Sequence, residues 1–600
     1  MRALLMGLKH LELEKRIDIG GWLLVAVLCV IVPSVAIASS SASGAEIPLI
    51  DAAKNSDSSA VQALLEQQPD SAKLTEPDGT SALHYAANRS DLATVQFLLA
   101  AGASVDVMNR YGVRPLALAV ESGYAPVVKE LLKAGADANS SQFGGETLLM
   151  TAARTGDPET VRLLLEYGAD VHAKEETRGQ TALMWGAVNG NAAAIAELLA
   201  AGADVHARSY TPEKPDKPRG ASMWQPDKNE AWYDESITYG ALTSIAFATR
   251  RGHLEAVGAL LDGGANADDV AIVMHSEPPT PILTLAIANA HYELAAYLLD
   301  RGADPNLATN GWSALHQLAR ARSEPAKKRT NVGWTEGPNM TGNISGLDLA
   351  TKLIEKGANV DARMTREFND FYRLASYVSR VDATPLLMAA RVSDAPLMRL
   401  LLEAGADPTL PSADGITPLM SAAGSGIRSP MEDGIDKDSP EALRLMLDIE
   451  GLDVNQVDKR GWTALHGAAY RGSLPVIQML VDHGANLNVR TNVGDESTGR
   501  KYTDLGLNKT GWLPVHIADG IVVGGIFFRQ VPGAALLRTL MEEQGLPIPL
   551  DEGLMRGTYQ ADDTTEQRLL KDGRTRPAYG GFLEPVKEDD DPEDSTIKKQ

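Results

Sequence analysis

The chain has 600 residues, too many for a single hydrophobic core, so it holds either several domains or one extended array of repeats. Hydrophobic residues make up 44% of it, which excludes a disordered chain and a polytopic membrane protein, and the aromatic share of 5% suits closely packed helices better than a β-sandwich. The formal net charge is −23 with no basic cluster along the sequence, so nucleic acid is not an expected partner.

The N-terminal segment carries an export signature. Residues 1–20 are polar with mixed charge, whereas residues 21–38 (GWLLVAVLCVIVPSVAIA) contain no charge and end in the A-x-A cleavage pattern Ala36-Ile37-Ala38. We expect residues 1–45 to be either a cleaved signal peptide or an uncleaved membrane anchor. The remaining chain would then lie outside the cytoplasm, either in the periplasm or extracellular space or anchored to the membrane. Cys29 is the only cysteine, so the rest of the chain has no disulfide, which favours a bacterial envelope.

From residue 45 onward the dominant feature is internal repetition. A leucine in a T-x-L-type tetrapeptide recurs, and the first four intervals between these leucines are 34, 33, 33 and 34 residues. The leucines are Leu49, Leu83, Leu116, Leu149, Leu183, Leu242, Leu283, Leu315, Leu386, Leu419 and Leu465, with Val515 as a degenerate last member. A glycine, nearly always followed by alanine, recurs alongside them: Gly102, Gly135, Gly168, Gly202, Gly264, Gly302, Gly357, Gly405 and Gly484. The later intervals are longer, which indicates insertions into the same unit.

A period near 33 residues with a T-P-L-H-like opening resembles the ankyrin repeat. The resemblance is nearly complete over residues 79–106 and 461–488, and it extends over about 47–548, with 11 recognisable units and a worn twelfth. It implies an all-α ankyrin-repeat solenoid of helix-turn-helix units with β-hairpin fingers and long insertions. We expect the solenoid to occupy residues 46–550 and residues 551–600 to form an acidic, disordered tail.

The residues of the unit favour the same structure on physical grounds. Thr384-Pro385 places a capping Thr before a first-turn Pro. Val128, Leu131 and Leu132 form an apolar stripe on the second helix, and Gly135 ends that helix where a left-handed residue is needed. One unit cannot bury its apolar face alone, so stability must come from stacked neighbours.

Five insertions interrupt the repeats, at about residues 208–237, 322–345, 364–382, 424–439 and 489–510. Two of them hold aromatic side chains that are partner-binding candidates: Trp224, Trp232 and Tyr233 in the first, and Phe368, Phe371 and Tyr372 in the third. Insertions into repeats map to loops, often on the binding face. The alternative is that these aromatic rings are buried and anchor their own loops.

A second set of candidates follows a glycine at the same place in four repeats: Trp312, Ile416, Trp462 and Trp512. The resemblance places this position at the fingers that border the concave surface. We expect an exposed apolar ladder there, of the residue type enriched at binding hot spots. The alternative is that each Trp packs on the neighbouring finger and only stiffens the array.

Catalytic interpretations are weaker. His84, His316, His466 and His516 recur at one repeat position, which favours a hydrogen-bonding role at a helix start. The sequence lacks the HExxH, P-loop, nucleophile-elbow and EF-hand motifs. We therefore expect no enzyme, no metal and no cofactor.

These observations predict an exported, monomeric scaffold that binds another protein through its concave face and fingers. Two alternatives remain open. One is an accessory or chaperone-like factor for a co-exported enzyme, and the other is an enzyme built from the insertions, with acids such as Asp234 and Glu235. A membrane would be contacted only through an uncleaved N-terminal segment.

Overall fold

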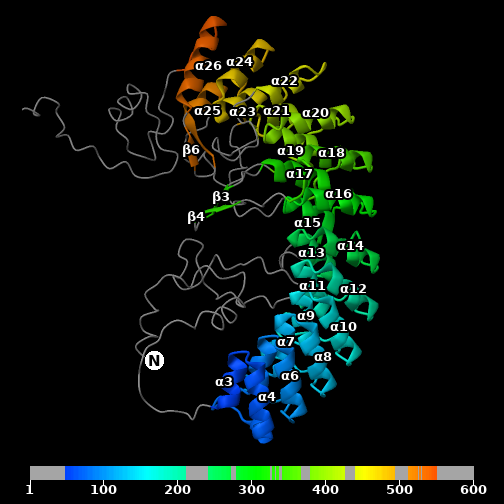
Figure 1. Cartoon of the computed structure of the whole chain (residues 1–600). Helices are drawn as coiled ribbons and strands as arrows, with labels where there is room; N and C mark the ends of the chain where they lie inside the picture. Colours follow the sequence, from blue (N-terminus) through cyan, green and yellow to red (C-terminus); the bar gives the residue numbers. More distant parts are fainter. Residues whose placement is uncertain are drawn as a thin grey trace, which may run out of the picture.

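The computed structural model describes residues 47–210, 241–271, 279–323, 327–330, 333–336, 341–366, 379–425, 440–492, 511–523, 526–528 and 530–549. Within these residues the helices form twelve pairs, stacked side by side in one curved array (Figure 1). The predicted all-α repeat solenoid is thereby confirmed. The predicted N-terminal signal or anchor and the predicted acidic tail lie outside the described residues.

The first helix of each pair lies on the concave side of the array and the second on the convex side (Figure 1). The inner helices are α3 (Pro48–Lys54), α5 (Ala82–Asn88), α7 (Pro115–Ser122), α9 (Leu148–Thr155), α11 (Ala182–Asn189), α13 (Ser244–Arg251), α15 (Ile282–Ala288), α17 (Ala314–Ser323), α19 (Pro385–Arg391), α21 (Pro418–Ala422), α23 (Ala464–Arg471) and α25 (Pro514–Gly520). The outer helices are α4 (Ser58–Gln67), α6 (Leu92–Ala100), α8 (Ala125–Lys133), α10 (Pro158–Glu166), α12 (Ala192–Ala200), α14 (Leu254–Asp262), α16 (Tyr292–Asp300), α18 (Gly346–Glu355), α20 (Ala395–Glu403), α22 (Glu441–Leu447), α24 (Leu474–Asp482) and α26 (Val531–Glu543). Two 3₁₀ turns are η2 (Pro69–Lys73) and η3 (Phe143–Gly145).

Side-chain caps begin both kinds of helix. Thr384 starts α19 by accepting a hydrogen bond from the Leu387 N–H, with Pro385 in the first turn. Asp157 starts α10 in the same way, accepting from the Thr160 N–H. These caps satisfy N–H groups that a helix cannot pair internally, so the T-P-L pattern marks the helix starts.

A row of Asp and Asn side chains joins the loops that follow the outer helices. The Asp170 N–H donates to the Asn139 Oδ1 at 2.8 Å, and the Asn139 Nδ2 donates to the Gly168 carbonyl at 2.8 Å. The same pair of bonds recurs where Asn455 contacts Asn486 and Gly484. Each bond joins one repeat to the next, so the loops stack in register along the array.

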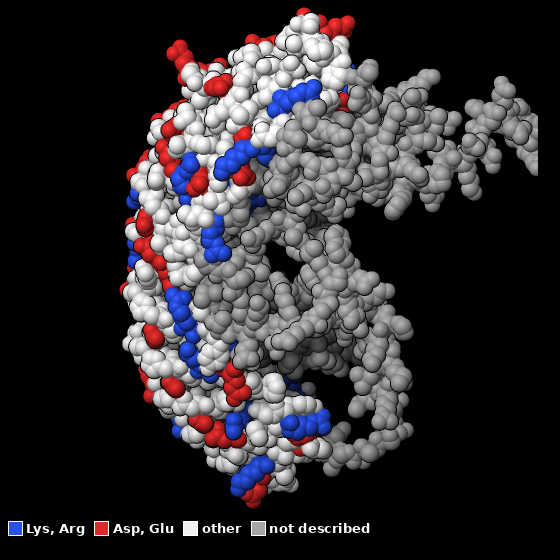
Figure 2. Space-filling model, turned by 180° about the vertical axis from the view of Figure 1, so that it is seen from behind, with Lys and Arg blue, Asp and Glu red and all other residues white. Residues whose placement is uncertain are grey.

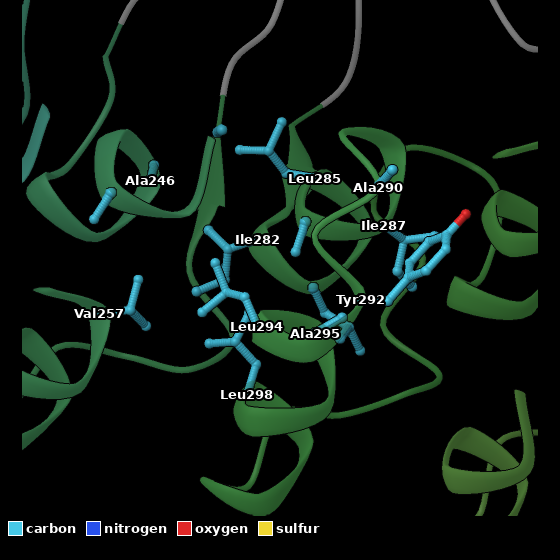
Figure 3. Close-up of a cluster of buried hydrophobic side chains, with 14 of the residues drawn as sticks. Ala246, Val257, Ile282, Leu285, Ile287, Ala290, Tyr292, Leu294, Ala295 and Leu298 are labelled. Atoms are coloured by element: carbon cyan, nitrogen blue, oxygen red, sulfur yellow. The ribbon is translucent and has the colours of Figure 1, made fainter. Parts of the chain in front are cut away.

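The core runs the whole length of the array between the two layers of helices. Figure 3 shows a part of it, in which Ile282 of α15 and Leu294 and Leu298 of α16 cluster, with Val257 of α14 facing them. All four side chains are buried. The predicted stripe on α8 is buried as well, with Leu132 only 2% exposed. Because each repeat buries its apolar face against its neighbours, no unit has a closed core of its own.

Three two-stranded antiparallel hairpins accompany the helices in the described residues. They pair β1 (Val270–Ala271) with β2 (Thr280–Pro281), β3 (Lys327–Thr330) with β4 (Gly333–Glu336), and β5 (Ile521–Val523) with β6 (Ile526–Phe528). The β3–β4 hairpin lies within the predicted insertion at 322–345, between α17 and α18 of one repeat. The β5–β6 hairpin joins the two helices of the worn last unit. The sequence pattern predicted an insertion at 322–345 but not its two strands.

Candidate partner-binding surface

The fingers between successive repeats are joined edge to edge by backbone hydrogen bonds. The Arg110 N–H donates to the Asp78 carbonyl at 2.7 Å, and the Tyr210 N–H donates to the Arg178 carbonyl at 2.6 Å. The bond recurs in the C-terminal half, where the Asn492 N–H donates to the Arg460 carbonyl at 2.7 Å. The fingertips are therefore held at fixed positions relative to one another, as a preorganised binding surface requires.

The recurrent histidines lie at the start of an inner helix and form hydrogen bonds that join this helix to the next finger. The His466 Nδ1 accepts from the Thr463 N–H at 3.0 Å, so the proton lies on Nε2, which donates to the Trp512 carbonyl of the next finger at 3.0 Å. His84 makes the same two contacts, with Ser81 and Val113. Burial lowers the pKa of His466 to about 4, which keeps the ring neutral at physiological pH. These contacts bear out the hydrogen-bonding interpretation of His84 and His466.

His316 and His516 occupy the same position in their repeats. The His316 Nε2 donates to the Ala383 carbonyl at 3.0 Å, and the His516 Nδ1 accepts from the Leu513 N–H at 3.1 Å. Burial lowers the pKa of each ring to about 4. All four rings thus accept a hydrogen bond at the start of their helix, and His84, His316 and His466 also donate to the next finger.

The expected exposed ladder is wrong for three of its four members. Trp312 and Trp462 are each 7% exposed, and Ile416 is 2% exposed. The side chains turn onto the inner helix of their own repeat: the Trp312 Nε1 donates to the Gln317 Oε1 at 3.0 Å. Trp512 is half-buried and contacts the ring of His516 edge-on. Trp312 and Trp462 therefore contact the inner helix of their own repeat, whereas the alternative interpretation placed them on the neighbouring finger, and of the four residues only Trp512 is partly accessible.

The environment of Trp462 explains why this aromatic position is buried. Its ring lies edge-on to Tyr470, with 6.2 Å between centroids, and the Arg460 guanidinium stands over it at 4.6 Å. Arg460 in turn donates to the Asp458 carboxylate at 2.7 Å, and Asp458 is itself buried. The indole is thus enclosed by the finger that carries it and by α23.

The insertion aromatics Trp224, Trp232, Tyr233, Phe368, Phe371 and Tyr372 lie outside the described residues. Their role in binding a partner stays a prediction.

The structure instead exposes apolar side chains at fingertips that the sequence analysis did not single out. Phe143 is 96% exposed, Tyr111 65% and Met108 55%, all on two neighbouring fingers. Tyr210, on the finger two further along, is 49% exposed. The available signal was the residue directly before a fingertip glycine, in Tyr111-Gly112 and Phe143-Gly144, where a polar residue would be expected in a solvated turn.

The exposed charges of the described fingers are mostly basic. The exposed basic residues there are Arg110, Lys174, Arg178, Arg363, Arg366, Lys459 and Arg490, and the exposed acidic ones are Glu176 and Asp382. The loops that follow the outer helices instead expose acids: Asp106, Asp137, Asp170, Asp204, Asp304 and Asp453. Figure 2 shows the same segregation, with acidic side chains along the convex outline and a column of basic side chains nearer the concave side.

Two features of the described residues bear on alternative functions. No group of three or more His, Cys, Asp or Glu side chains among the described residues could hold a metal ion. In the same part of the chain, no helix is long and apolar enough to cross a membrane.

Comparison with known families agrees with this geometry. A family model for ankyrin repeats (three copies) matches residues 49–142, 138–209 and 433–518. A model for the single ankyrin repeat matches residues 280–310 and 382–413. The stacked helix pairs and joined fingers define a repeat scaffold, and the chain belongs to the ankyrin-repeat family. Proteins of this family typically act as non-enzymatic scaffolds for protein–protein interaction.

Several curated proteins share part of this array. The ankyrin repeat protein nuc-2 of Neurospora crassa is 31% identical over 144 residues, which are 24% of this chain and 11% of that protein. The NAD-dependent deacetylase sir2B of Dictyostelium discoideum is 23% identical over 285 residues, covering 44% of this chain and 34% of that protein. The human neurogenic locus notch homolog protein 1 is 30% identical over 185 residues, covering 27% of this chain and 7% of that protein. The chain thus matches no more than 34% of the length of any of these three relatives.

Among solved structures, the crystal structure of the human ASB11 ankyrin repeat domain is 24% identical, with a TM-score of 0.33. The match covers 43% of this chain and 99% of that one.

Proposed function

We propose that this chain is an exported scaffold that holds a partner protein against its concave face and fingers. The observation that carries the proposal is the row of described fingers, most of them joined to a neighbour by backbone hydrogen bonds, with apolar tips left in solvent. A rigid surface loses little conformational freedom when it binds, and exposed aromatic rings gain by being covered.

The partner surface is tested by capture from the envelope fraction of the cells that make the protein. The full chain is compared with a Tyr111→Ala/Trp512→Ala variant, which alters one fingertip and the one accessible member of the aromatic ladder. A matched control is Tyr124→Ala/Tyr167→Ala, whose side chains are 39% and 44% exposed at the ends of outer helices.

We expect the full chain and the control to retain one partner that the finger variant loses, while all three remain fully folded at the temperature of the capture. Equal capture by both variants would move the binding surface away from the fingers. Capture of nothing by the full chain would count against the scaffold itself.

Export is proposed on the uncharged segment at 21–38 and the pattern Ala36-Ile37-Ala38. N-terminal sequencing of the mature chain tests it. We expect a chain that begins at Ser39 in the soluble envelope fraction, or an uncleaved chain in the membrane fraction if the segment acts as an anchor. An uncleaved chain in the cytosol would contradict export.

A further inference from the structure

Three neighbouring fingers near the N-terminal end carry a distinctive set of exposed side chains. The N-terminal finger patch comprises Met108, Arg110, Tyr111, Phe143, Lys174 and Arg178. Three members are apolar or aromatic and three are basic, and all six are exposed. In the remaining described fingers the basic residues recur, but large exposed apolar side chains are sparser, with Leu74, Tyr210 and Val457 as examples. The combination of both chemistries is therefore local to this end of the array.

The apolar members stand out from the surface. Phe143 is 96% exposed, and it lies at the tip of a finger whose backbone is held by the contact of the Gly144 carbonyl with the Glu176 N–H. The Arg110 guanidinium lies 4.7 Å from the Tyr111 ring centroid, so one cation and one aromatic face are presented together. A solvated ring of this size on a rigid tip is the residue type that anchors protein interfaces.

The charge of the patch is opposite to that of the molecule. Arg110, Lys174 and Arg178 are exposed in it against Glu176, whereas the whole chain has a formal net charge of −23. An acidic partner would be repelled by the aspartates of the loops that follow the outer helices, and it would be attracted only at the fingers. The long-range field of the chain also disfavours an anionic membrane or nucleic acid, which would face all of the negative charge at once.

We propose that the N-terminal finger patch binds an acidic segment of the partner protein that carries apolar side chains among its carboxylates. The proposal rests on the proposed scaffold function and names the chemistry of its partner. The apolar side chains of the segment would cover Phe143, Tyr111 and Met108, and its carboxylates would pair with Arg110, Lys174 and Arg178.

The test uses the full chain and two labelled synthetic peptides in fluorescence anisotropy. One peptide alternates Glu with Leu and Phe, and the other has Gln in place of every Glu. We expect the acidic peptide to bind at least about tenfold more tightly than its Gln counterpart, with the difference shrinking at high salt.

Two variants and two matched controls locate the binding. Phe143→Ala and Lys174→Glu should each weaken binding of the acidic peptide by about tenfold or more. Tyr167→Ala and Lys129→Glu make the same kinds of change at exposed positions, at the end of α10 and on α8, and should leave binding unchanged. All of these residues are at the surface, so melting temperatures should agree among the variants.

Several outcomes would overturn the proposal. These are equal affinity for the two peptides, equal loss of affinity in the outer-helix controls, or Phe143-dependent binding to phosphatidylserine vesicles without binding to the acidic peptide. Much tighter peptide binding by a chain that ends at residue 550 would show that the acidic tail of the chain itself fills the patch. If a partner is captured from cells and the Phe143→Ala and Lys174→Glu variants bind it as tightly as the full chain does, the scaffold function is supported and the inference about the N-terminal finger patch is contradicted.

Discussion

At the scale of single residues, the histidines show how one side chain joins two repeats. His316 accepts at Nδ1 from the Ser313 N–H and donates at Nε2 to Ala383 in the next repeat, so it needs one bare nitrogen and one proton. Protonation of Nδ1 would break the first contact inside a buried site. The ring is therefore tuned to the neutral form by its surroundings.

The first prediction concerns acid stability. Burial lowers the folded-state pKa of His316 and His466 to about 4 from an ordinary value of 6.5, so folding favours the neutral rings. Their contribution is complete above about pH 6.5 and is lost as the pH falls from there through about 4. We expect the melting temperature to decrease over this window.

A His466→Asn variant separates this effect from carboxylate titration. It should melt lower than the parent at pH 7 and lose less on acidification, whereas His206→Asn, an exposed histidine at a finger base, should behave as the parent does. A parent and His466→Asn with parallel pH profiles would contradict the assignment.

At the scale of the helix pair, the turn between the inner and the outer helix contains a left-handed residue, which is a glycine in some repeats and a residue with a Cβ in others. Gly190 ends α11 in the left-handed region with φ of 75°, and a Cβ there would meet the His253 Nδ1 at 2.7 Å. Ser56, which is exposed, occupies the equivalent place after α3 with φ of 55°, a conformation that costs an L-residue with a Cβ about 1–2 kcal/mol. The array therefore carries local strain at this turn.

The second prediction follows from this pair of turns. Ser56→Gly should stabilise the fold by about 0.5–1 kcal/mol, because the relief of strain exceeds the extra entropy of the unfolded glycine. Gly190→Ala should destabilise it by more than that, since strain and overlap with His253 add. Chemical denaturation measures both, and opposite signs are required. A destabilising Ser56→Gly would show that the turn is not strained.

How much could be predicted from the sequence differs between these elements and the site. The helix pairs followed from spaced Leu, Gly and Thr-Pro markers, since caps and core stripes depend on local order. The burial of Trp462 did not follow, because it depends on whether the ring turns toward Tyr470 of α23 or toward solvent, and its own finger contributes Arg460 to the enclosing side. The exposure of Phe143 was missed because a single apolar residue in a turn has no periodic pattern to mark it.

At the scale of the whole molecule, the larger contacts among the described helices join neighbouring helix pairs along the array. In such a quasi-one-dimensional stack, each repeat is stabilised mainly by its neighbours. A destabilising substitution should therefore lower the stability of its own and the adjacent repeats most, and the fingers near it should lose their order first.

The third prediction tests this locality. Leu132 of α8 is 2% exposed, so Leu132→Ala should cost on the order of 2–5 kcal/mol. Amide hydrogen exchange should accelerate most in α7 to α10 and least in α23 to α26. Uniform acceleration along the chain would instead show that the array unfolds as a single cooperative unit, and a shift in stability near zero would contradict the burial of Leu132.

We propose that the row of fingers, and not the outer helices, is the partner surface of this scaffold. Site-specific photo-crosslinking in the cells that make the protein tests it most directly, with the crosslinking amino acid placed at Phe143 in one chain and at Tyr167 in another. We expect one discrete protein adduct from position 143 and none from position 167. An adduct from position 167 alone, or none from either position, would contradict it.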